Sequence, residues 1–415
     1  MKPTITIIGA GISGLTAAVY LHKKGFKIQI LEASDRAGGR IKTDEIDGFK
    51  LDIGFQVLLT EYPETKALLD YKKLNLKRFL PGATVLYDGG KFEIADPFRR
   101  PTALFSTLFA RVGSLKDKIN TFFLKRKLVK ISISNLFKQP EVETIAQLKN
   151  YGFSKKMIDR FYKPFFSGIF LENDLKTSST MFDFVMKMFS EGDAAIPELG
   201  MEEIPKQLVA MLPENSIQYN VKVSAIENNK IICENGLVIE TDKIIIATEA
   251  IGLASAYVSK EKQNFHQVTN VYFEAKIAPA KKAVVVLNAA THKKWVNNLT
   301  VLSNVSNRYA PKGKVLISIS YNGIPAIDDS TLAENMKAEL KKWYGNQVED
   351  WKLLKTFRIK YALPNQEKVS NEISNSEIKI NENLFICGDH LLNGSINAAM
   401  KSGRIVAELI ESNFH

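Results

Sequence analysis

The beginning of the chain alternates short apolar runs with a glycine-rich break. A continuous apolar run at residues 4–8 predicts a buried strand, and a run with helical periodicity at 15–24 predicts a helix. A second strand is expected at 27–31, immediately before Glu32. Strand, Gly-x-Gly-x-x-Gly, helix, strand and acid is the order that a dinucleotide-binding unit requires. An ordinary βαβ turn is the alternative interpretation.

Each glycine of this unit has its own expected role. Gly9 permits a tight turn, Gly11 lets the backbone approach a pyrophosphate, and Gly14 brings helix and strand together. The helix that begins around Ser13 offers unpaired N–H groups to phosphates. Glu32 lies eighteen residues after Gly14, where its carboxylate can accept hydrogen bonds from ribose hydroxyls.

The next loop strengthens the dinucleotide interpretation. Gly38 and Gly39 leave space beside the phosphates, and the guanidinium groups of Arg36 and Arg40 are suited to bind them with paired hydrogen bonds. Two solvated arginines on a loop are the alternative.

The pattern then predicts strands and one helix, followed by a helical region. The expected elements before residue 101 are a strand at 48–54, a helix at 62–73 and a hairpin at 83–94. A glycine at 54 would let the backbone lie close to a flat ring, which Gln56 could hydrogen-bond. Residues 101–212 are helical in pattern, with Ser114, Thr144, Ser154 and Ser179 or Thr180 as expected helix starts and Pro164 as a stop.

Strands return in the second half of the chain. Apolar and alternating runs predict a group of strands between 217 and 248, of which 243–247 suits a buried parallel strand. A second, mainly antiparallel sheet is expected from 268–275, 282–287, 299–303, 314–321 and 351–361, with a helix at 330–344 capped by Ser330. The chain closes with a strand at 384–389 and a helix at 395–411.

This order predicts an α/β protein whose Rossmann-like domain is split into three segments. We expect residues 1–60, 200–255 and 375–415 to form a dinucleotide domain. Residues 61–199 and 256–374 would form an inserted α+β substrate domain. Gly388 and Asp389, with the following helix N-terminus, make a second pocket for a polar chain. FAD has both an adenosine end and a polyol chain, and would use both pockets.

Composition narrows the class of protein. With 45% hydrophobic and 24% charged residues, the 415-residue chain is typical of a folded protein. We expect no leader and no membrane-spanning helix, and therefore a cytoplasmic location. Cys233 and Cys387 lie in apolar strand-like runs, so two buried reduced thiols are favoured over a disulfide or a metal pair.

The positive charge is concentrated in one stretch. Residues 98–130 carry nine cations against one anion, Asp117, and supply +8 of the net +11. Two interpretations remain open. The stretch is either a helical part of the substrate domain with solvated charges, or an amphipathic surface that contacts anionic lipid. No recognised nucleic-acid motif accompanies the charge, so we expect no nucleic-acid partner.

The sequence resembles the FAD-dependent amine oxidase superfamily, nearest its protoporphyrinogen-oxidase-like and phytoene-desaturase-like members. The motifs that carry the resemblance run nearly end to end: 9–15, Glu32, 36–40, 51–54, 113–118, 161–164, 168–169, 197–201, 221–223, 243–248, 387–389 and 395–404. The resemblance implies a flavoenzyme that transfers a hydride from its substrate to flavin N5. By position it implies that the adenosine-pyrophosphate half is held by Gly9, Gly11, Gly14, Glu32, Arg40 and Val223. It implies that the ribityl chain and ring lie near Gly54, Gln56, Asp389, Ile396 and Asn397.

Two departures from the amine oxidase pattern bear on the substrate. Residues 268–273 contain no lysine, whereas amine oxidases resemble one another in a lysine near the flavin on that strand. Ser395 stands where they place a tyrosine. We therefore favour dehydrogenation or desaturation of an apolar or polycyclic small molecule. An amine oxidase and a non-catalytic flavin-fold binding protein remain alternatives.

No catalytic acid or base can be assigned. His266, His292 and His390 are candidates by residue type alone, and His390 follows Asp389 directly. Tyr272, Tyr321 and Tyr361 could line the substrate pocket together with Gln56, but core packing accounts for the tyrosines equally well.

Overall fold

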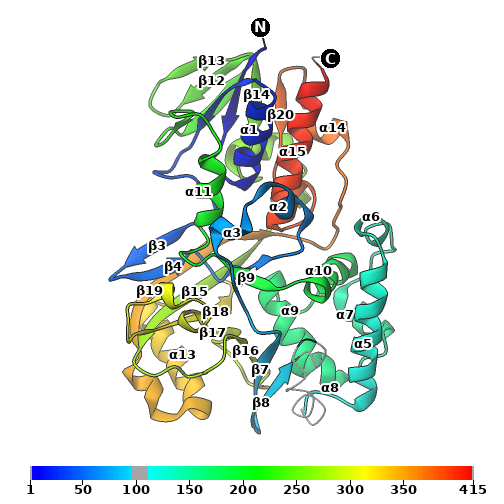
Figure 1. The fold of residues 1–415 in the computed structure, drawn as a ribbon, viewed down its shortest axis with the longest axis vertical. Coiled ribbons are helices and arrows are strands. Elements are labelled where there is room, and N and C mark those ends of the chain that lie inside the picture. Colours follow the sequence, from blue (N-terminus) through cyan, green and yellow to red (C-terminus); the bar gives the residue numbers. More distant parts are fainter. Residues whose placement is uncertain (1, 96–98, 100–110, 414–415) are drawn as a thin grey trace.

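A five-stranded parallel sheet forms the upper part of the molecule in Figure 1. The computed structural model describes residues 2–95, 99 and 111–413. The strand order is β10-β2-β1-β14-β20, and the register places Ile5 opposite Ile28 and Lys243. The strands are β1 (Thr4–Ile8), β2 (Lys27–Leu31), β10 (Ile217–Gln218), β14 (Lys243–Ile246) and β20 (Leu384–Ile386). One sheet thus draws on three distant parts of the chain.

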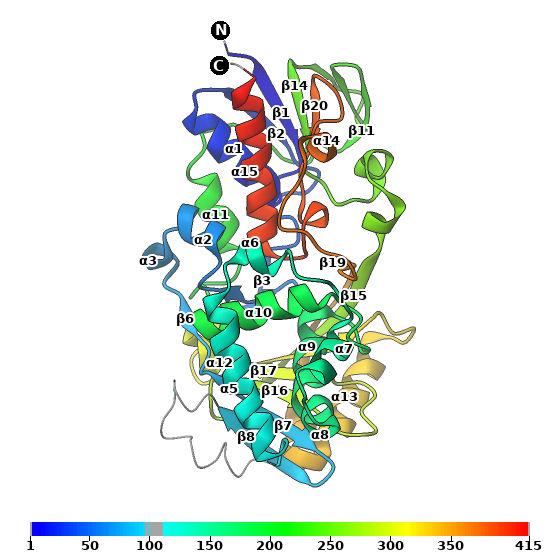
Figure 2. The same ribbon diagram turned by 90° about the vertical axis from the view of Figure 1, so that its right-hand side faces the viewer.

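Both faces of this sheet are covered, which explains its continuous apolar strands. Helices α1 (Ile12–Lys23) and α15 (Ile396–Ser412) run side by side on one face (Figures 1 and 2). The other face packs against a small antiparallel sheet, where Ile8 and Ile246 share a core with Ile231. That sheet consists of β11 (Val223–Glu227), β12 (Lys230–Cys233) and β13 (Val238–Glu240).

The second large sheet has seven strands and is mainly antiparallel, as predicted. Its order is β19-β15-β18-β17-β16-β7-β8, with one parallel pairing, between β16 and β7. Helix α13 (Asp329–Tyr344) covers one face, where Val271, Ile319 and Leu299 are buried. The strands are β7 (Gly82–Tyr87), β8 (Gly90–Ala95), β15 (Phe265–Ala275), β16 (Val285–Asn288), β17 (Asn298–Val301), β18 (Val315–Asn322) and β19 (Lys352–Pro364).

A group of helices lies beside the second sheet, at the lower right of Figure 1. Its members are α5 (Leu115–Lys130), α6 (Ile133–Leu136), α7 (Thr144–Asn150), α8 (Lys155–Met157), α9 (Lys163–Phe170) and α10 (Ser179–Glu191). Phe166, Phe170 and Phe182 are fully buried among them. Ser114 caps α5 as predicted, its hydroxyl oxygen accepting from the Asp117 N–H at 3.2 Å.

Short elements join the two parts of the molecule. The two small sheets are β3 (Thr43–Ile46) with β4 (Phe49–Asp52), and β5 (Leu58–Leu59) with β9 (Ala194–Ile196) and β6 (Lys77–Arg78). The helices are α2 (Pro63–Leu68), α3 (Tyr71–Leu74), α11 (Glu203–Val209), α12 (Leu302–Val305) and α14 (Asn375–Ile378). Glu64 accepts two hydrogen bonds from Arg404, which fastens α2 to α15.

Several local predictions were wrong for identifiable reasons. Pro164 does not end a helix, because the chain stays helical from α8 through a π-helical turn at Ile158–Tyr162 into α9, and this turn already departs from the usual hydrogen-bond pattern just before Pro164. The helix expected at 62–73 is two helices, since the Asp70 carboxylate accepts from Lys72 and Lys73 N–H groups and starts a new one. Asp328, not Ser330, caps α13.

Two expectations about the whole chain can be compared with the structure. Cys233 and Cys387 are both buried free thiols, as predicted. Among the residues that the structure describes, no helix is both long and apolar enough to cross a bilayer. Of the basic stretch 98–130, residues 98 and 100–110 lie outside the described residues.

Candidate cofactor site and substrate cavity

The glycines in the turn after β1 differ in what a side chain at each position would meet. A Cβ on Gly9 would lie 2.9 Å from the Ala247 carbonyl oxygen, and one on Gly14 would lie 2.2 Å from the Gly9 oxygen. A Cβ on Gly11 would meet no described atom within 4 Å. Gly9 and Gly14 are therefore required by the protein's own packing, whereas Gly11 leaves its side of the backbone open to the cavity that it lines.

The first turn of α1 is left available to a ligand. Its N-cap, Gly11, makes no side-chain capping bond, and no acidic side chain stands in the first turn. Ser13, in that turn, lines the same cavity. Such a helix end presents N–H groups and a positive dipole to an anion.

Glu32 is held firmly at the end of β2. One carboxylate oxygen accepts from the Ala10 N–H at 2.7 Å, and the other accepts from the Ser34 N–H and hydroxyl at 2.9 and 2.6 Å. The side chain lines the cavity together with Val223. The carboxylate is thus fixed beside the glycine turn, where the sequence predicts a ribose contact.

The two arginines of the glycine-rich loop have different surroundings. Arg40 lines the cavity, donating to the Asp389 carboxylate at 2.6 Å and to the Ala362 carbonyl at 3.2 Å. Arg36 does not line it; its guanidinium lies 2.5 Å from Asp44 and 3.2 Å from Glu202. The expectation of a phosphate contact is therefore wrong for the Arg36 side chain, because neighbouring carboxylates engage it elsewhere.

Gly38 and Gly39 bring this loop against the first turn. Both have left-handed backbones, with φ of +125° and +60°, and the Gly38 N–H donates to the Ala10 carbonyl at 2.9 Å. A Cβ on Gly39 would lie 3.2 Å from the Gly11 Cα. The glycines are needed for this close approach.

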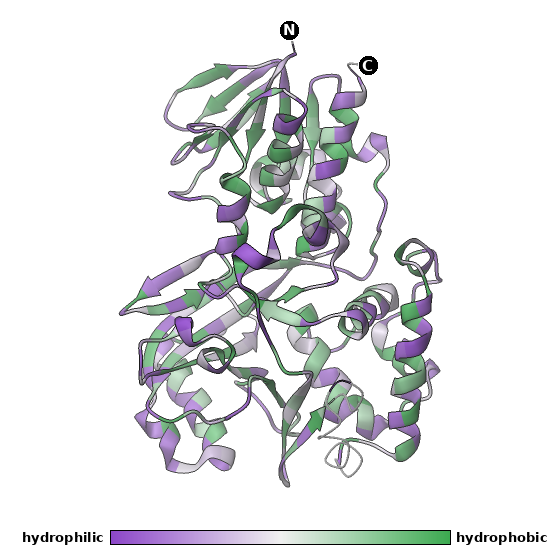
Figure 3. Cartoon of the chain, in the orientation of Figure 1, coloured by the Kyte–Doolittle hydropathy of each residue, from purple (hydrophilic) through white to green (hydrophobic). Residues whose placement is uncertain are grey.

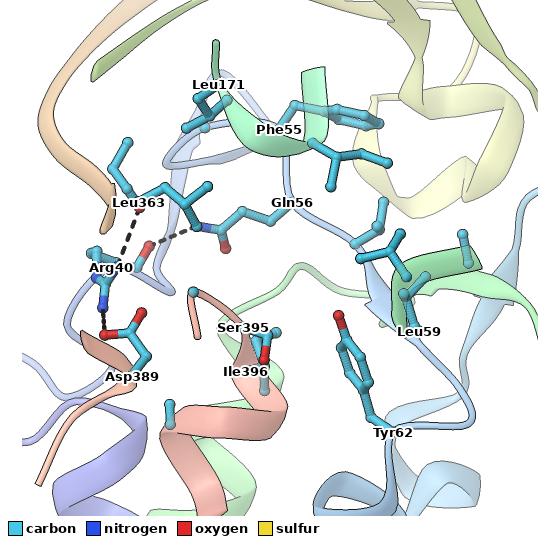
Figure 4. A pocket seen from close by; sticks show the side chains of 18 of the residues that line it. Arg40, Phe55, Gln56, Leu59, Tyr62, Leu171, Leu363, Asp389, Ser395 and Ile396 are labelled. Carbon is cyan, nitrogen blue, oxygen red and sulfur yellow. Dashed lines mark hydrogen bonds and ion pairs between the residues drawn. The ribbon is translucent and has the colours of Figure 1, made fainter. Parts of the chain in front are cut away.

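A second group of predicted residues lies around Arg40 and the start of α15 (Figure 4). The Gln56 amide nitrogen donates to the Arg40 carbonyl at 3.0 Å, while its buried oxygen has no partner among the described residues. Gly54, with φ of +90°, approaches the Ile359 side chain too closely for a Cβ. Ile396 begins α15 and lines the cavity beside Gly388 and Asp389.

Asn397 lies apart from these residues. Its side-chain oxygen accepts from the Glu64 N–H at 3.0 Å, and the residue is buried without lining the cavity. The Asn397 side chain therefore holds the first turn of α2 and does not point into the cavity.

The cavity continues beyond Gln56 into a largely apolar chamber. The whole cavity, including this chamber, has a volume of about 1110 Å³, above the roughly 300–1,000 Å³ of an ordinary small-molecule pocket. The helical segment around α9 and the second sheet both supply walls, which include Phe161, Phe165, Ile169, Leu171, Val285, Leu287 and Ala83. The space is large enough for an extended cofactor and a second molecule.

The part of the cavity wall formed by α5 and Arg99, which contains exposed residues and is here called the mouth, is cationic. Five positive side chains and one carboxylate, Asp193, stand there among the described residues, and the positive ones are Arg99, Lys118, Lys125, Arg126 and Lys130. Asp193 is itself paired with Arg78 and Arg99. Four of the five cations come from one face of α5.

Sequence reasoning missed Tyr62. Its ring stacks on Phe184 with centroids 5.8 Å apart, and its hydroxyl points into the cavity opposite Gln56 (Figure 4). Burial raises its pKa well above the ordinary value, so the hydroxyl keeps its proton. Its position before Pro63 signals only a helix start, so no sequence pattern identifies it.

The predicted pocket tyrosines lie elsewhere: Tyr272, Tyr321 and Tyr361 are not part of the cavity wall. The Tyr272 hydroxyl donates to the Asp52 carbonyl at 2.8 Å, and Tyr321 and Tyr361 pack on Trp295 and Phe265. For these three residues the core-packing alternative holds.

None of the three candidate histidines, His266, His292 and His390, lines the cavity either. Burial lowers the pKa of His390 to about 4, so its ring is neutral at pH 7. Its Nε2 is buried without a partner among the described residues, and its ring stands against Gly388. His266 is half-buried on β15, and burial lowers its pKa as well.

Comparison with known proteins identifies the family. The family model described as flavin containing amine oxidoreductase matches residues 12–411. The chain belongs to this family. The expectation of a flavin cofactor is thereby confirmed, and the family is one of flavin-containing oxidoreductases.

Individual relatives match shorter segments. The chain is similar to protoporphyrinogen oxidase 2 of Arabidopsis thaliana, with 25% identity over 40% of this chain and 32% of that protein. It is 37% identical to probable polyamine oxidase 4 of the same plant, over 21% of this chain and 18% of the relative. It is also 46% identical to 1-hydroxycarotenoid 3,4-desaturase of Flavobacterium sp. (strain P99-3), over 13% of this chain and 11% of that protein. These matches span a third or less of the curated relatives' length.

The likeness to solved structures covers the whole chain. The putative protoporphyrinogen oxidase from Exiguobacterium sp. 255-15 superposes with a TM-score of 0.75 at 17% identity, covering 100% of this chain and 99% of that one. At this identity the likeness establishes the α/β fold, with its mixed sheets and helices.

The site fits the cofactor of the family. Gly11 leaves an open backbone surface, α1 presents an uncapped N-terminus, and Glu32 and Asp389 both line one continuous cavity. An adenosine end, a pyrophosphate and a polyol chain are the groups for which these features are suited.

Proposed function

We propose that the protein uses FAD to dehydrogenate or desaturate an apolar, small molecule. The observation that carries this proposal is the single cavity that runs from Glu32 and Gly11, past Gln56, into an apolar chamber walled by α9 and the second sheet. A substrate there would meet the cofactor in a space from which its own apolar body excludes water. FAD supplies the two-electron acceptor when bound.

The proposed cofactor contacts follow the two ends of the site. Gly9, Gly11, Ser13, Gly14, Glu32, Gly38, Gly39, Arg40 and Val223 would surround the adenosine-pyrophosphate half. Gly54, Gln56, Gly388, Asp389 and Ile396 would surround the ribityl chain and ring. In domain terms we propose 1–60, 200–255 and 375–415 as the FAD-binding domain, with 61–199 and 256–374 as the substrate domain.

The chain's own contribution to the reaction is placement and desolvation. Gln56 is fixed through its amide nitrogen and keeps its oxygen for a ligand. Tyr62 offers a hydroxyl that stays protonated, and therefore a hydrogen-bond donor, at physiological pH. No described residue in the chamber is placed to act as a general base, which suits transfer of a hydride without a strong base.

The mouth of the cavity argues against amines as substrates. An ammonium or a polyamine would pass a part of the wall where five cationic side chains outnumber one carboxylate, Asp193. Like charges at this spacing repel. Residues 268–273 on β15 also offer no lysine, and Val268 lines the chamber where that strand passes.

We further propose that α5 rests on an anionic membrane surface from which the substrate enters. Leu115, Ile119 and Phe123 form an exposed stripe at four-residue spacing, with Phe123 61% exposed. Arg126, Lys127 and Lys130 are exposed on the next turns, and Figure 3 shows hydrophobic and hydrophilic residues intermixed along this helix. Cations beside exposed apolar side chains suit an interfacial helix.

Absorbance spectroscopy tests the enzymatic proposal. The purified protein should be yellow, and its flavin absorbance should bleach anaerobically with apolar polycyclic substrates but not with putrescine or spermidine. A preparation that neither contains nor takes up FAD would refute the proposal. FAD binding without bleaching by any candidate would instead favour the non-catalytic binder.

A further inference from the structure

A polar band lies on the face of the second sheet that looks toward α9 and reaches the wall of the otherwise apolar chamber at Asn298 and Ser320. Asn298 of β17 pairs with Ser320 of β18, which pairs with Asn270 of β15. Directly opposed residues in a sheet point to the same face. The three side chains therefore form one row across three strands. The next row contains Thr300, opposite Ser318.

Most polar groups of this band lack protein partners, although the Ser318 hydroxyl donates to the Asn270 side-chain oxygen at 3.2 Å. Among the described residues, no hydrogen-bond partner exists for the buried Ser320 hydroxyl, the Thr300 hydroxyl or the Asn270 amide nitrogen. The same holds for both amide atoms of Asn297 and for the Ser167 hydroxyl at the facing end of α9. Each of these residues is less than 10% exposed.

Such a band is not what stability alone would select. A buried polar group without a partner costs free energy, and an apolar side chain of similar shape would avoid that cost. On the opposite face of the same three strands the corresponding residues are apolar, since Val271, Leu299 and Ile319 pack there against α13. The polar residues on the chamber face therefore require another explanation.

The band lies within reach of a substrate beside the cofactor. Asn298 and Ser320 are part of the cavity wall. Val268, which also lines the cavity, precedes Asn270 by two positions, about 7 Å along the strand. Val268 pairs with Ile359, whose side chain touches the position of a Cβ on Gly54. One row of side chains thus separates the band from the proposed ring site.

Gly168 keeps the helix close to this band. A Cβ at Gly168 would lie 2.5 Å from the Asn298 amide nitrogen and 3.1 Å from that of Asn297. Helix α9 can therefore pack directly over the two amides, which closes the band on its outer side.

We propose that this band recognises a neutral oxygen-bearing group, a hydroxyl or a ketone, on the apolar substrate. The inference rests on the proposed function for the presence of a substrate in the chamber. Amides and hydroxyls supply both donors and acceptors, so they satisfy either group. A charged group is excluded, because no charged side chain among the described residues hydrogen-bonds the band, and an unpaired buried charge is costly.

The test compares ligands that differ in one oxygen. Binding of phenanthrene and 9-phenanthrol to the FAD-loaded protein is measured by calorimetry, and bleaching of the flavin is followed separately. The hydroxylated ligand should bind roughly tenfold to hundredfold more tightly. Equal affinities, including no measurable binding of either, would mean that the band serves no ligand and would overturn the inference.

Variants identify the residues responsible. Asn298→Leu and, independently, Ser320→Ala should lower the preference for the hydroxyl while leaving the melting temperature unchanged or higher. Thr356→Val is the matched control, because it removes a partnerless buried hydroxyl from the α13 side of the same sheet, opposite Val271. A preference unchanged in both test variants would overturn the inference.

The two proposals fail in different ways. A hydroxyl preference without bleaching by any candidate substrate would refute the dehydrogenase proposal and leave the polar band standing. Bleaching with equal affinity for both ligands would do the reverse.

Discussion

The guanidinium of Arg40 and the carboxylate of Asp389 form an ion pair of 2.6 Å across 349 residues of sequence. The pair joins the glycine-rich loop near the N-terminus to the end of β20. Both groups line the cavity, so the contact holds together two parts of the proposed FAD site.

Replacing Arg40 should separate cofactor binding from general stability. Arg40→Met removes a cation from the cavity wall, and FAD affinity should fall about tenfold to hundredfold, the range of a lost charge-assisted hydrogen bond. Arg36→Met is the control, because Arg36 is paired with Asp44 and Glu202 outside the cavity. Titration of the apoprotein with FAD, followed by flavin fluorescence, should show an unchanged dissociation constant for the control. Equal losses in both variants would contradict the assignment.

Gly14 and Gly11 should respond to substitution by alanine in opposite ways. Gly14→Ala places a Cβ 2.2 Å from a backbone oxygen, so the apoprotein should be destabilised by more than about 2 kcal/mol. A Cβ on Gly11, by contrast, would have open space around it. Gly11→Ala should therefore leave the melting temperature of the apoprotein unchanged and weaken FAD binding at least tenfold. Unchanged FAD affinity in the Gly11 variant would argue against a pyrophosphate at that position.

Asp52 should make stability depend on pH. Its carboxylate accepts from Thr43, Tyr309 and the Met201 N–H, yet burial raises its pKa from 3.8 to about 6. The folded state thus binds a proton that the unfolded state has released between pH 4 and 6. The stabilisation is present below pH 4 and is lost as the pH rises through 6, by on the order of 3 kcal/mol.

Urea denaturation of wild type and Asp52→Asn from pH 4 to 7 measures this effect. The difference in the free energy of unfolding should shift in favour of the variant as the pH rises. Asp183, whose pKa burial also raises to about 6, contributes equally to both proteins and cancels. A difference that is independent of pH would exclude Asp52 as the source.

Tyr62→Phe tests the hydroxyl that points into the cavity. Removing one hydrogen-bond donor to the bound substrate should slow flavin reduction about tenfold, while FAD affinity stays unchanged. Because burial keeps the pKa of Tyr62 well above its ordinary range, the ratio of the two rates should not vary between pH 6 and 9. Stopped-flow reduction measures the rates, and a ratio that changes within that range would assign Tyr62 a proton-transfer role instead.

Charge reversal on α5 tests the membrane proposal. Arg126, Lys127 and Lys130 changed together to Glu should abolish co-sedimentation with anionic vesicles, since each basic residue near such a surface contributes about 1 kcal/mol. The matched control reverses three exposed lysines elsewhere, Lys276, Lys281 and Lys312. Binding that both triple variants lose equally would reflect net charge rather than α5.

The dinucleotide unit was predictable because its features are local. Strand, glycine turn, helix and Glu32 lie within about thirty residues, and each position has a steric or electrostatic reason that its neighbours in sequence reveal. The split sheet also followed from sequence, since the run at 243–247 is apolar on both sides and suits an interior parallel strand.

The chamber was less predictable because its walls are set by tertiary packing. Tyr272 and Tyr62 are both tyrosines in apolar surroundings, but only the packing of β15 and α2 decides that Tyr62 reaches the cavity. Arg36 and Arg40 are four residues apart in one loop, and their difference depends on Asp44, Glu202 and Asp389. Contacts with such distant residues leave no periodic signal in the sequence.

The parallel sheet also constrains how the protein is made. On the ribosome, β1, α1 and β2 emerge early, but β20 and α15 emerge only after more than 350 further residues. At synthesis rates of about 5–20 residues per second, the nascent N-terminal unit waits on the order of 20–70 s for its neighbours. During that time α1 lacks the helix that covers it, and β14, once it is made, has no partner on one edge until β20 follows. Chaperone protection of the growing chain, and FAD loading only after β20 and α15 have emerged, would follow from this single feature of strand order.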